Sequence, residues 1–134
     1  MSQENVEIVR AANEAYNAGD IDTMLRFYAV DTEVIPDSSA FVEAQPLRGL
    51  EAFRGWLDEI AKAWISVRWE IQEARAVGTD RVLLRGDWGG TGPGSGIEIL
   101  SSFTGIYTVR DGQIDRLEFF ADHAQALKAV GVEE

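Results

Sequence analysis

Residues 97–121 read IEILSSFTGIYTVRDGQIDRLEFFA, and this stretch decides the fold. Apolar and polar side chains alternate on both sides of Arg110-Asp111-Gly112, which is the pattern of two half-buried strands joined by a turn. The sequence therefore predicts an antiparallel hairpin. Its long strand runs from Ile97 to Val109 and its last strand from Gln113 to Ala121.

Two registers fit this hairpin, and they place different side chains inside. A two-residue Asp-Gly turn would pair Gly105 with Glu118, whereas a three-residue loop with glycine in the left-handed position would pair Gly105 with Leu117. A slip of one residue moves every side chain of a strand to the other face. Only the three-residue register separates an apolar face from a mostly polar one, so we predict that register. The predicted inner face holds Ile99, Ser101, Phe103, Gly105, Tyr107, Asp115, Leu117, Phe119 and Ala121.

Helical patterns come before these strands. The first predicted helix runs from Ser2 to about Ala18, and Gly19 ends it. Asp20 caps a second helix, and a third runs from about Leu50 to Ala63. The apolar stripe of the second helix is Ile21, Met24, Leu25 and Tyr28.

The remaining segments complete an α+β domain. A short strand is predicted at Thr32–Ile35, and alternation predicts two more around 67–72 and 82–88. The glycine-rich segment 89–96 is interpreted as a loop at the lip, and Asp122 caps a short closing helix. Helices followed by antiparallel strands indicate an α+β cone, in which a strongly curved sheet wraps around the N-terminal helices. We expect one domain over residues 1–134.

Composition excludes several classes of protein. The formal net charge is −11, which disfavours nucleic acid and anionic membranes as partners. The absence of cysteine excludes disulfides and thiolate metal sites and fits a reducing compartment. With a polar N-terminus and no long apolar run, we expect a cytoplasmic protein.

Several short runs carry a resemblance to a known family. Asn17-Ala18-Gly19-Asp20-Ile21-Asp22, Leu47-Arg48-Gly49-Leu50 and Val109-Arg110-Asp111-Gly112-Gln113-Ile114 occur in the order and spacing of the nuclear-transport-factor-like superfamily. The chain most resembles its SnoaL-like group, which is named for polyketide cyclases. The resemblance covers nearly the whole chain and implies a conical fold with a deep pocket, often in a dimer. Fold alone does not settle function, because members include isomerases, hydrolases, cyclases and binders.

The catalytic residues of these relatives do not carry over. Counting from the shared motif, the isomerase oxyanion tyrosine falls on Ala12, its general base on Pro36 and its second oxyanion acid on Gly105. The Arg and Asp of the epoxide hydrolases fall on Phe103 and Gly105, and the cyclase acid falls on Phe119. The resemblance therefore implies a different chemistry or none.

Four other groups are candidates for the site, each with a structural alternative. Asp37 follows the first strand at the expected mouth of the cone and would serve as a general base, unless it is an exposed loop acid. Tyr16 would hydrogen-bond a ligand, unless it is a core tyrosine bonded to backbone. Tyr107 and Asp115 would orient a ligand or bond one another. His123, the single histidine, would shuttle protons, unless it is an exposed residue beside the Asp122 cap.

These residues predict an apolar pocket and no cofactor. A lone histidine disfavours a metal site, and the glycine-rich segment lacks the Lys-Ser/Thr of a phosphate loop. Three functions stay open: a proton-transfer enzyme with Asp37 or Tyr16 as the active group, a non-catalytic binder of a small apolar molecule, and a homodimer formed through the sheet. In the dimer, Ile106, Ile114 and Phe120 would meet the partner. The predicted pocket residues are Tyr28, Trp56, Trp88, Ser101, Phe103, Tyr107, Asp115, Leu117, Phe119 and His123.

Overall fold

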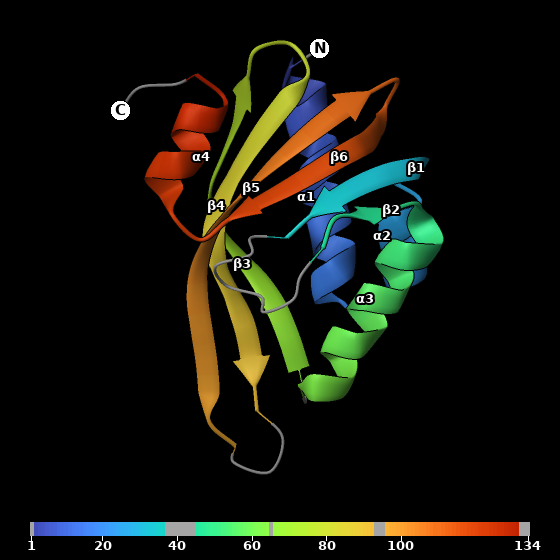
Figure 1. Cartoon of the computed structure of the whole chain (residues 1–134), viewed down its shortest axis with the longest axis vertical. Coiled ribbons are helices and arrows are strands. Elements are labelled where there is room, and N and C mark those ends of the chain that lie inside the picture. Colours follow the sequence, from blue (N-terminus) through green and yellow to red (C-terminus); the bar gives the residue numbers. More distant parts are fainter. Residues whose placement is uncertain (1, 37–44, 65, 93–95, 132–134) are drawn as a thin grey trace.

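The computed structural model describes residues 2–36, 45–64, 66–92 and 96–131. These residues form four helices and six strands (Figure 1). In chain order the elements are α1 (Ser2–Asn17), α2 (Ile21–Leu25), β1 (Tyr28–Ile35), β2 (Leu47–Arg48), α3 (Leu50–Ala63), β3 (Ser66–Val77), β4 (Arg81–Thr91), β5 (Glu98–Arg110), β6 (Gln113–Phe120) and α4 (His123–Ala129).

All six strands belong to one curved sheet, in the order β2-β1-β6-β5-β4-β3. Strands β3 to β6 form an antiparallel meander, whereas β1 lies parallel to β6 and antiparallel to β2. Figure 1 shows β4 and β5 continuing as a long arm past the end of α3. The predicted α+β cone is confirmed, with the parallel pair as an added feature. The extent of the domain stays a prediction.

The main core lies between the helices and the concave face of the sheet. Val9 of α1 and Phe53 of α3 are buried together with Val82, Leu84 and Leu117 of the strands. Helix α4 packs against β5 and β6 outside this core, and its buried residues are Ala126 and Leu127. The sheet therefore carries a large core on one face and a small one on the other.

Helix α1 is held to the free edge of β3 through the backbone of Trp69. Asn17 accepts a hydrogen bond from the Trp69 N–H at 2.8 Å and donates one to its carbonyl oxygen at 3.0 Å. Asn13, one turn earlier in the helix, donates to the same carbonyl at 3.1 Å. Two asparagines thereby satisfy backbone groups that an edge strand would leave unpaired.

The last hairpin differs from the predicted register in two compensating ways. The turn is the two-residue one, with Asp111 and Gly112 both at positive φ, so the predicted three-residue loop is wrong. A bulge at Asp115 then shifts the pairing so that Gly105 faces Phe119. With this shift, odd-numbered residues of β5 again pair with odd-numbered residues of β6, as in the predicted register. The predicted inward face of Leu117 and Phe119 is therefore confirmed.

The bulge does reverse the orientation of two neighbouring residues. Ile114 is fully buried in the core rather than on the outer face. Asp115, predicted to face inward beside Tyr107, lies beside the outer ion pairs and is 3.7 Å from Arg110. Ile106 is buried as well, so neither isoleucine is available to a partner. The homodimer through the sheet stays a prediction.

Several element boundaries also differ from the sequence prediction. Helix α2 ends at Leu25, and Tyr28 begins β1, so Tyr28 is a strand residue rather than the end of a helical stripe. Pairing with β6, including the hydrogen bond from the Ile114 N–H to the Phe27 carbonyl, favours the extended chain. Residues 89–91, predicted as loop, continue β4.

Glycines in β4 allow neighbouring strands to approach closely. A methyl group on Gly90 would overlap the backbone oxygen of Ser66, and one on Gly86 would overlap that of Glu70. The Gly86 contact lies beside the bulge between Ile71 and Glu73, where β3 bends. These positions accept only glycine without a shift of the sheet.

We predict opposite effects for two glycine-to-alanine substitutions. Gly90→Ala should lower the free energy of unfolding by about 1–3 kcal/mol or more, because the strands must move apart. Gly55→Ala is the matched control, since Gly55 lies in α3 with nothing near an added methyl group. Its alanine should raise stability by about 0.5–1 kcal/mol. Urea unfolding measures both, and equal effects would contradict the close approach.

Candidate functional site

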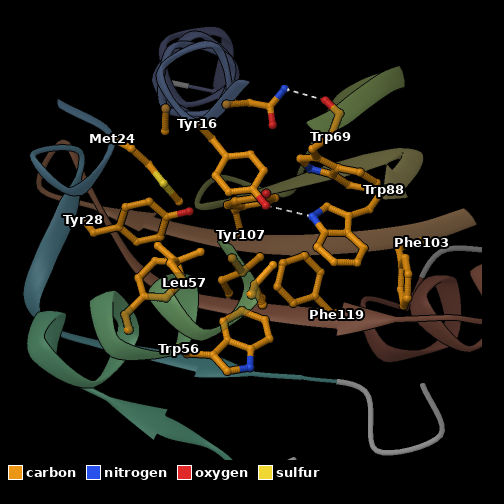
Figure 2. Close-up of a pocket in the computed structure, with 15 residues that line it drawn as sticks. Tyr16, Met24, Tyr28, Trp56, Leu57, Trp69, Trp88, Phe103, Tyr107 and Phe119 are labelled. Carbon is orange, nitrogen blue, oxygen red and sulfur yellow. Dashed lines mark hydrogen bonds between the residues drawn. The ribbon is translucent and has the colours of Figure 1, made fainter. Parts of the chain in front are cut away.

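A cavity of about 50 Å³ lies between the helices and the concave sheet face. This is room for a few waters, each needing at least about 10–15 Å³, or for one compact molecule. Aromatic side chains make up most of the wall (Figure 2). The lining residues are Ala12, Asn13, Tyr16, Met24, Tyr28, Phe53, Trp56, Leu57, Ile60, Trp69, Trp88, Phe103, Tyr107, Leu117 and Phe119.

Most of the residues predicted from sequence meet at this cavity. Tyr16 comes from α1, Tyr28 from β1 and Trp56 from α3, and the rest come from the inner face of β4, β5 and β6. Trp56 stacks on Phe53 and contacts Phe119, so α3 closes the wall opposite the sheet. The predicted residues on the strands are Trp88, Phe103, Tyr107, Leu117 and Phe119.

Three predicted pocket residues lie elsewhere. Ser101 lines an adjoining groove that shares Trp56, Trp88 and Phe103 with the cavity. Asp115 was turned to the outer face by the bulge described above. His123 lies at the start of α4, where its Nδ1 is 2.8 Å from the hydroxyl of Thr104, on the strand face opposite to Phe103.

Asp37, the predicted general base, lies outside the described residues. Asp122 caps α4, as predicted, by accepting a hydrogen bond from the Ala124 N–H at 2.9 Å.

Sequence reasoning missed the lining role of Asn13 and Trp69. Both were visible in their patterns, Asn13 on the inner face of α1 and Trp69 among the alternating residues of β3. Their closeness depends on the docking of α1 against β3, between residues 56 positions apart. No local periodicity contains that contact.

All three tyrosines of the chain line the cavity. Figure 2 shows the hydroxyls of Tyr16 and Tyr28 directed toward its middle. The Tyr16 oxygen accepts a hydrogen bond from the indole N–H of Trp88 at 2.9 Å, so its own proton is directed elsewhere. Burial raises the pKa of Tyr16, of Tyr28 and of Tyr107. These phenols therefore stay protonated at neutral pH and serve as neutral hydrogen-bonding groups.

The described lining residues include no carboxylate, histidine, lysine or arginine. Among all the residues that the structure describes, no three or more His, Cys, Asp or Glu side chains cluster in a way that could bind a metal ion. Within the described residues, no helix is both long and apolar enough to cross a bilayer.

Among the described residues, the buried amide oxygen Oδ1 of Asn13 has no hydrogen-bond partner. The indole Nε1–H of Trp69 makes no hydrogen bond of good geometry there, but it lies near the hydroxyl of Tyr107, where it opposes the larger effect of burial on the pKa of that phenol. Unpaired buried polar groups are uncommon and costly, so each one needs an explanation.

The curved sheet, the enclosing helices and the aromatic cavity define a nuclear-transport-factor-like α+β cone. The model of the SnoaL-like domain matches residues 9–117, and the chain belongs to this family. No curated protein matches the chain.

Solved structures of the same fold cover nearly the whole chain. A putative polyketide cyclase from Sinorhizobium meliloti is 29% identical, with a TM-score of 0.68 over 85% of this chain and 94% of that one. TerC, co-crystallised with polyporic acid, is 20% identical, with a TM-score of 0.76 over 96% and 98%. A nuclear-transport-factor-2-like protein of unknown function from Burkholderia pseudomallei is 17% identical, with a TM-score of 0.77 over 95% and 97%.

The structure also accounts for the glycine at one position where relatives were expected to carry an acid. An added Cβ on Gly105 would lie 3.0 Å from the ring of Tyr107. The tyrosine ring therefore fills the space that a side chain at position 105 would occupy. Ala12, at the expected oxyanion position, is likewise a small buried residue on the wall.

The tyrosine cluster predicts how stability changes at alkaline pH. Since all three pKa values are raised above 10.0 by folding, the unfolded chain loses its phenolic protons first. The phenols should therefore leave stability unchanged below about pH 10 and lower it as pH rises further. Phenolate absorbance, recorded together with circular dichroism, should appear only as the protein unfolds. A full phenolate signal near pH 10 in a natively folded sample would contradict this burial.

Proposed function

We propose that the protein binds a small, uncharged, largely apolar molecule in the aromatic cavity. One observation carries this proposal: the described wall offers rings, aliphatic groups and neutral hydrogen-bonding groups, but no ionised side chain. A charged ligand would lose its hydration there without gaining a partner of opposite charge. An uncharged ring gains contact with Trp56, Leu117 and Phe119.

Family membership supports a small-molecule role without specifying a reaction. Putative polyketide cyclases share the fold. TerC, which also has this fold, has been co-crystallised with polyporic acid. The cavity described above is small, so a compact ligand of about one ring fits it best.

The alternative is an enzyme that transfers a proton, with Asp37 and Tyr16 as the predicted active groups. Tyr16 favours the enzyme in one respect. Its hydroxyl oxygen already accepts a hydrogen bond from the Trp88 indole, so its proton is available to a ligand. With a raised pKa, however, Tyr16 is a weak acid and, while protonated, no base. Proton abstraction would thus depend on Asp37 alone, and we place binding first.

A cavity-filling substitution tests the proposed binding. Toluene, as a ring-sized probe, should raise the melting temperature and quench tryptophan fluorescence, since three of the four tryptophans line the cavity. At ten times its Kd it should add about 1.4 kcal/mol of stability. Ala12→Leu places extra carbon in the cavity and should remove most of this effect.

Ala52→Leu is the matched control, because Ala52 is exposed on α3. It should retain the full response to toluene. If toluene stabilises neither the native protein nor this control, or stabilises Ala12→Leu equally, the proposed ligand site is wrong.

A further inference from the structure

The groove that adjoins the cavity continues the apolar wall of helix α3. Trp56 and Ile60 of this helix line the cavity, and Ile60, Ala63 and Trp64 line the groove. Residues four apart lie on one face of a helix, so this wall leaves the cavity along a single apolar stripe. From Trp56 to Trp64 the stripe extends by about 12 Å, at 1.5 Å per residue. The helix therefore presents more apolar wall than the cavity uses.

Strand β5 forms the opposite wall over a similar distance. Alternate side chains of a strand share one face, so Phe103, Ser101 and Ile99 follow one another on the inner face. Phe103 lines both spaces, whereas Ser101 and Ile99 line the groove only. The four residues from Phe103 to Ile99 span about 13 Å. Ile99 is 52% exposed, so this end of the wall is apolar surface that the core does not cover.

Side chains from both walls form the boundary between cavity and groove. Trp56, Ile60, Trp88 and Phe103 belong to both spaces. On the cavity side, the indole N–H of Trp88 donates to Tyr16. On the groove side, the rings of Trp88 and Trp64 meet edge to face with their centroids 5.8 Å apart. Figure 2 shows Trp56 across the space from Trp88. The two spaces therefore meet between α3 and the sheet.

Size also connects the two spaces. The cavity has room for about one ring, whereas the groove measures about 640 Å³. Sites for small molecules typically measure about 300–1,000 Å³, a range that the cavity reaches only together with the groove. Glu59, which also lines the groove, is well exposed and lies 3.4 Å from Lys62, so its charge is directed to water.

We propose that the ligand is an elongated, uncharged molecule that occupies both spaces, an inference that rests on the binding function proposed above. Its compact end fills the aromatic cavity. An apolar extension passes between Trp56 and Trp88 and follows the groove toward Ile99. The cavity then selects the end of the ligand, and the groove selects its length.

Three phenols with para alkyl chains of increasing length test the groove: 4-methylphenol, 4-butylphenol and 4-octylphenol. They are uncharged at neutral pH, and the methyl compound occupies the cavity alone. Since an open groove removes about half of each methylene group from water, Kd should fall about twofold per methylene, or roughly a hundredfold from methyl to octyl. Calorimetry measures each Kd. A Kd that is unchanged or higher for the longer chains would contradict the groove.

Two charged variants locate the chain along β5. Ser101→Asp places a carboxylate near the boundary and should reduce the gain from methyl to butyl by about threefold or more. Ile99→Asp, farther out, should spare that gain and reduce the gain from butyl to octyl. Val30→Asp is the matched control, because Val30 is 77% exposed on β1, away from the groove. It should retain both gains. Comparing probes on one protein cancels changes in how the ring binds.

The outcomes separate this inference from the proposed function. If 4-methylphenol binds but longer chains add nothing, or if Val30→Asp loses the gains equally, the groove is overturned and the cavity site stands. If 4-methylphenol does not bind, both are overturned. If Ile99→Asp keeps every gain but changes the molecular mass measured by light scattering, the groove is a protein interface and the inference is wrong.

Discussion

The contact between helix α1 and the backbone of Trp69 is the constraint on which the rest of the structure depends. Among the described strands β3 ends the sheet, so one side of its backbone has no neighbouring strand there. Asn13 and Asn17 are one helical turn apart, and their side chains cover this side at a single residue. The helix is thereby fixed across the open margin of the sheet, where Ala12, Asn13 and Tyr16 become cavity wall. Without this docking the concave face would be open to solvent along its edge.

Curvature of the sheet is the second requirement, because a flat sheet would not enclose a cavity against α1 and α3. Close backbone approaches bring β4 against β3 at Gly86 and Gly90, and against β5 at Gly89. The bulge at Asp115 adds a residue to β6 where it lies between β1 and β5. One extra residue sends Ile114 into the core and Asp115 outward, and it leaves Leu117 and Phe119 facing the cavity. The same irregularity therefore shapes the sheet and keeps a carboxylate out of the site.

Sequence patterns predicted the faces of the strands better than the details that connect them. Alternation in β5 and β6 placed Phe103, Leu117 and Phe119 inside, because hydrophobic burial dictates the face whatever the turn. The same alternation also led to the prediction of a three-residue loop. A two-residue turn followed by a one-residue bulge puts the same side chains on the inner face, so the apolar pattern does not distinguish the two. Tyr28 fitted a helical stripe, and only its pairing partner in β6 made it a strand residue. The sequence did not predict that Asn13 and Trp69 line the cavity, because this depends on a long-range contact between a helix and a sheet edge.

The charge of the chain and the neutrality of its cavity are two parts of one arrangement. The sequence contains 23 acidic residues, yet the described cavity wall contains none of them. On the outer face Glu33 instead meets Arg48 at 3.3 Å and Arg116 at 3.1 Å, in a groove open to water. A carboxylate inside would need a partner or a raised pKa, and either would add acid–base chemistry to the site. Neutral phenols and an amide avoid this cost. In the proposed binding function, such a wall selects a ligand by its shape and apolar surface rather than by its charge.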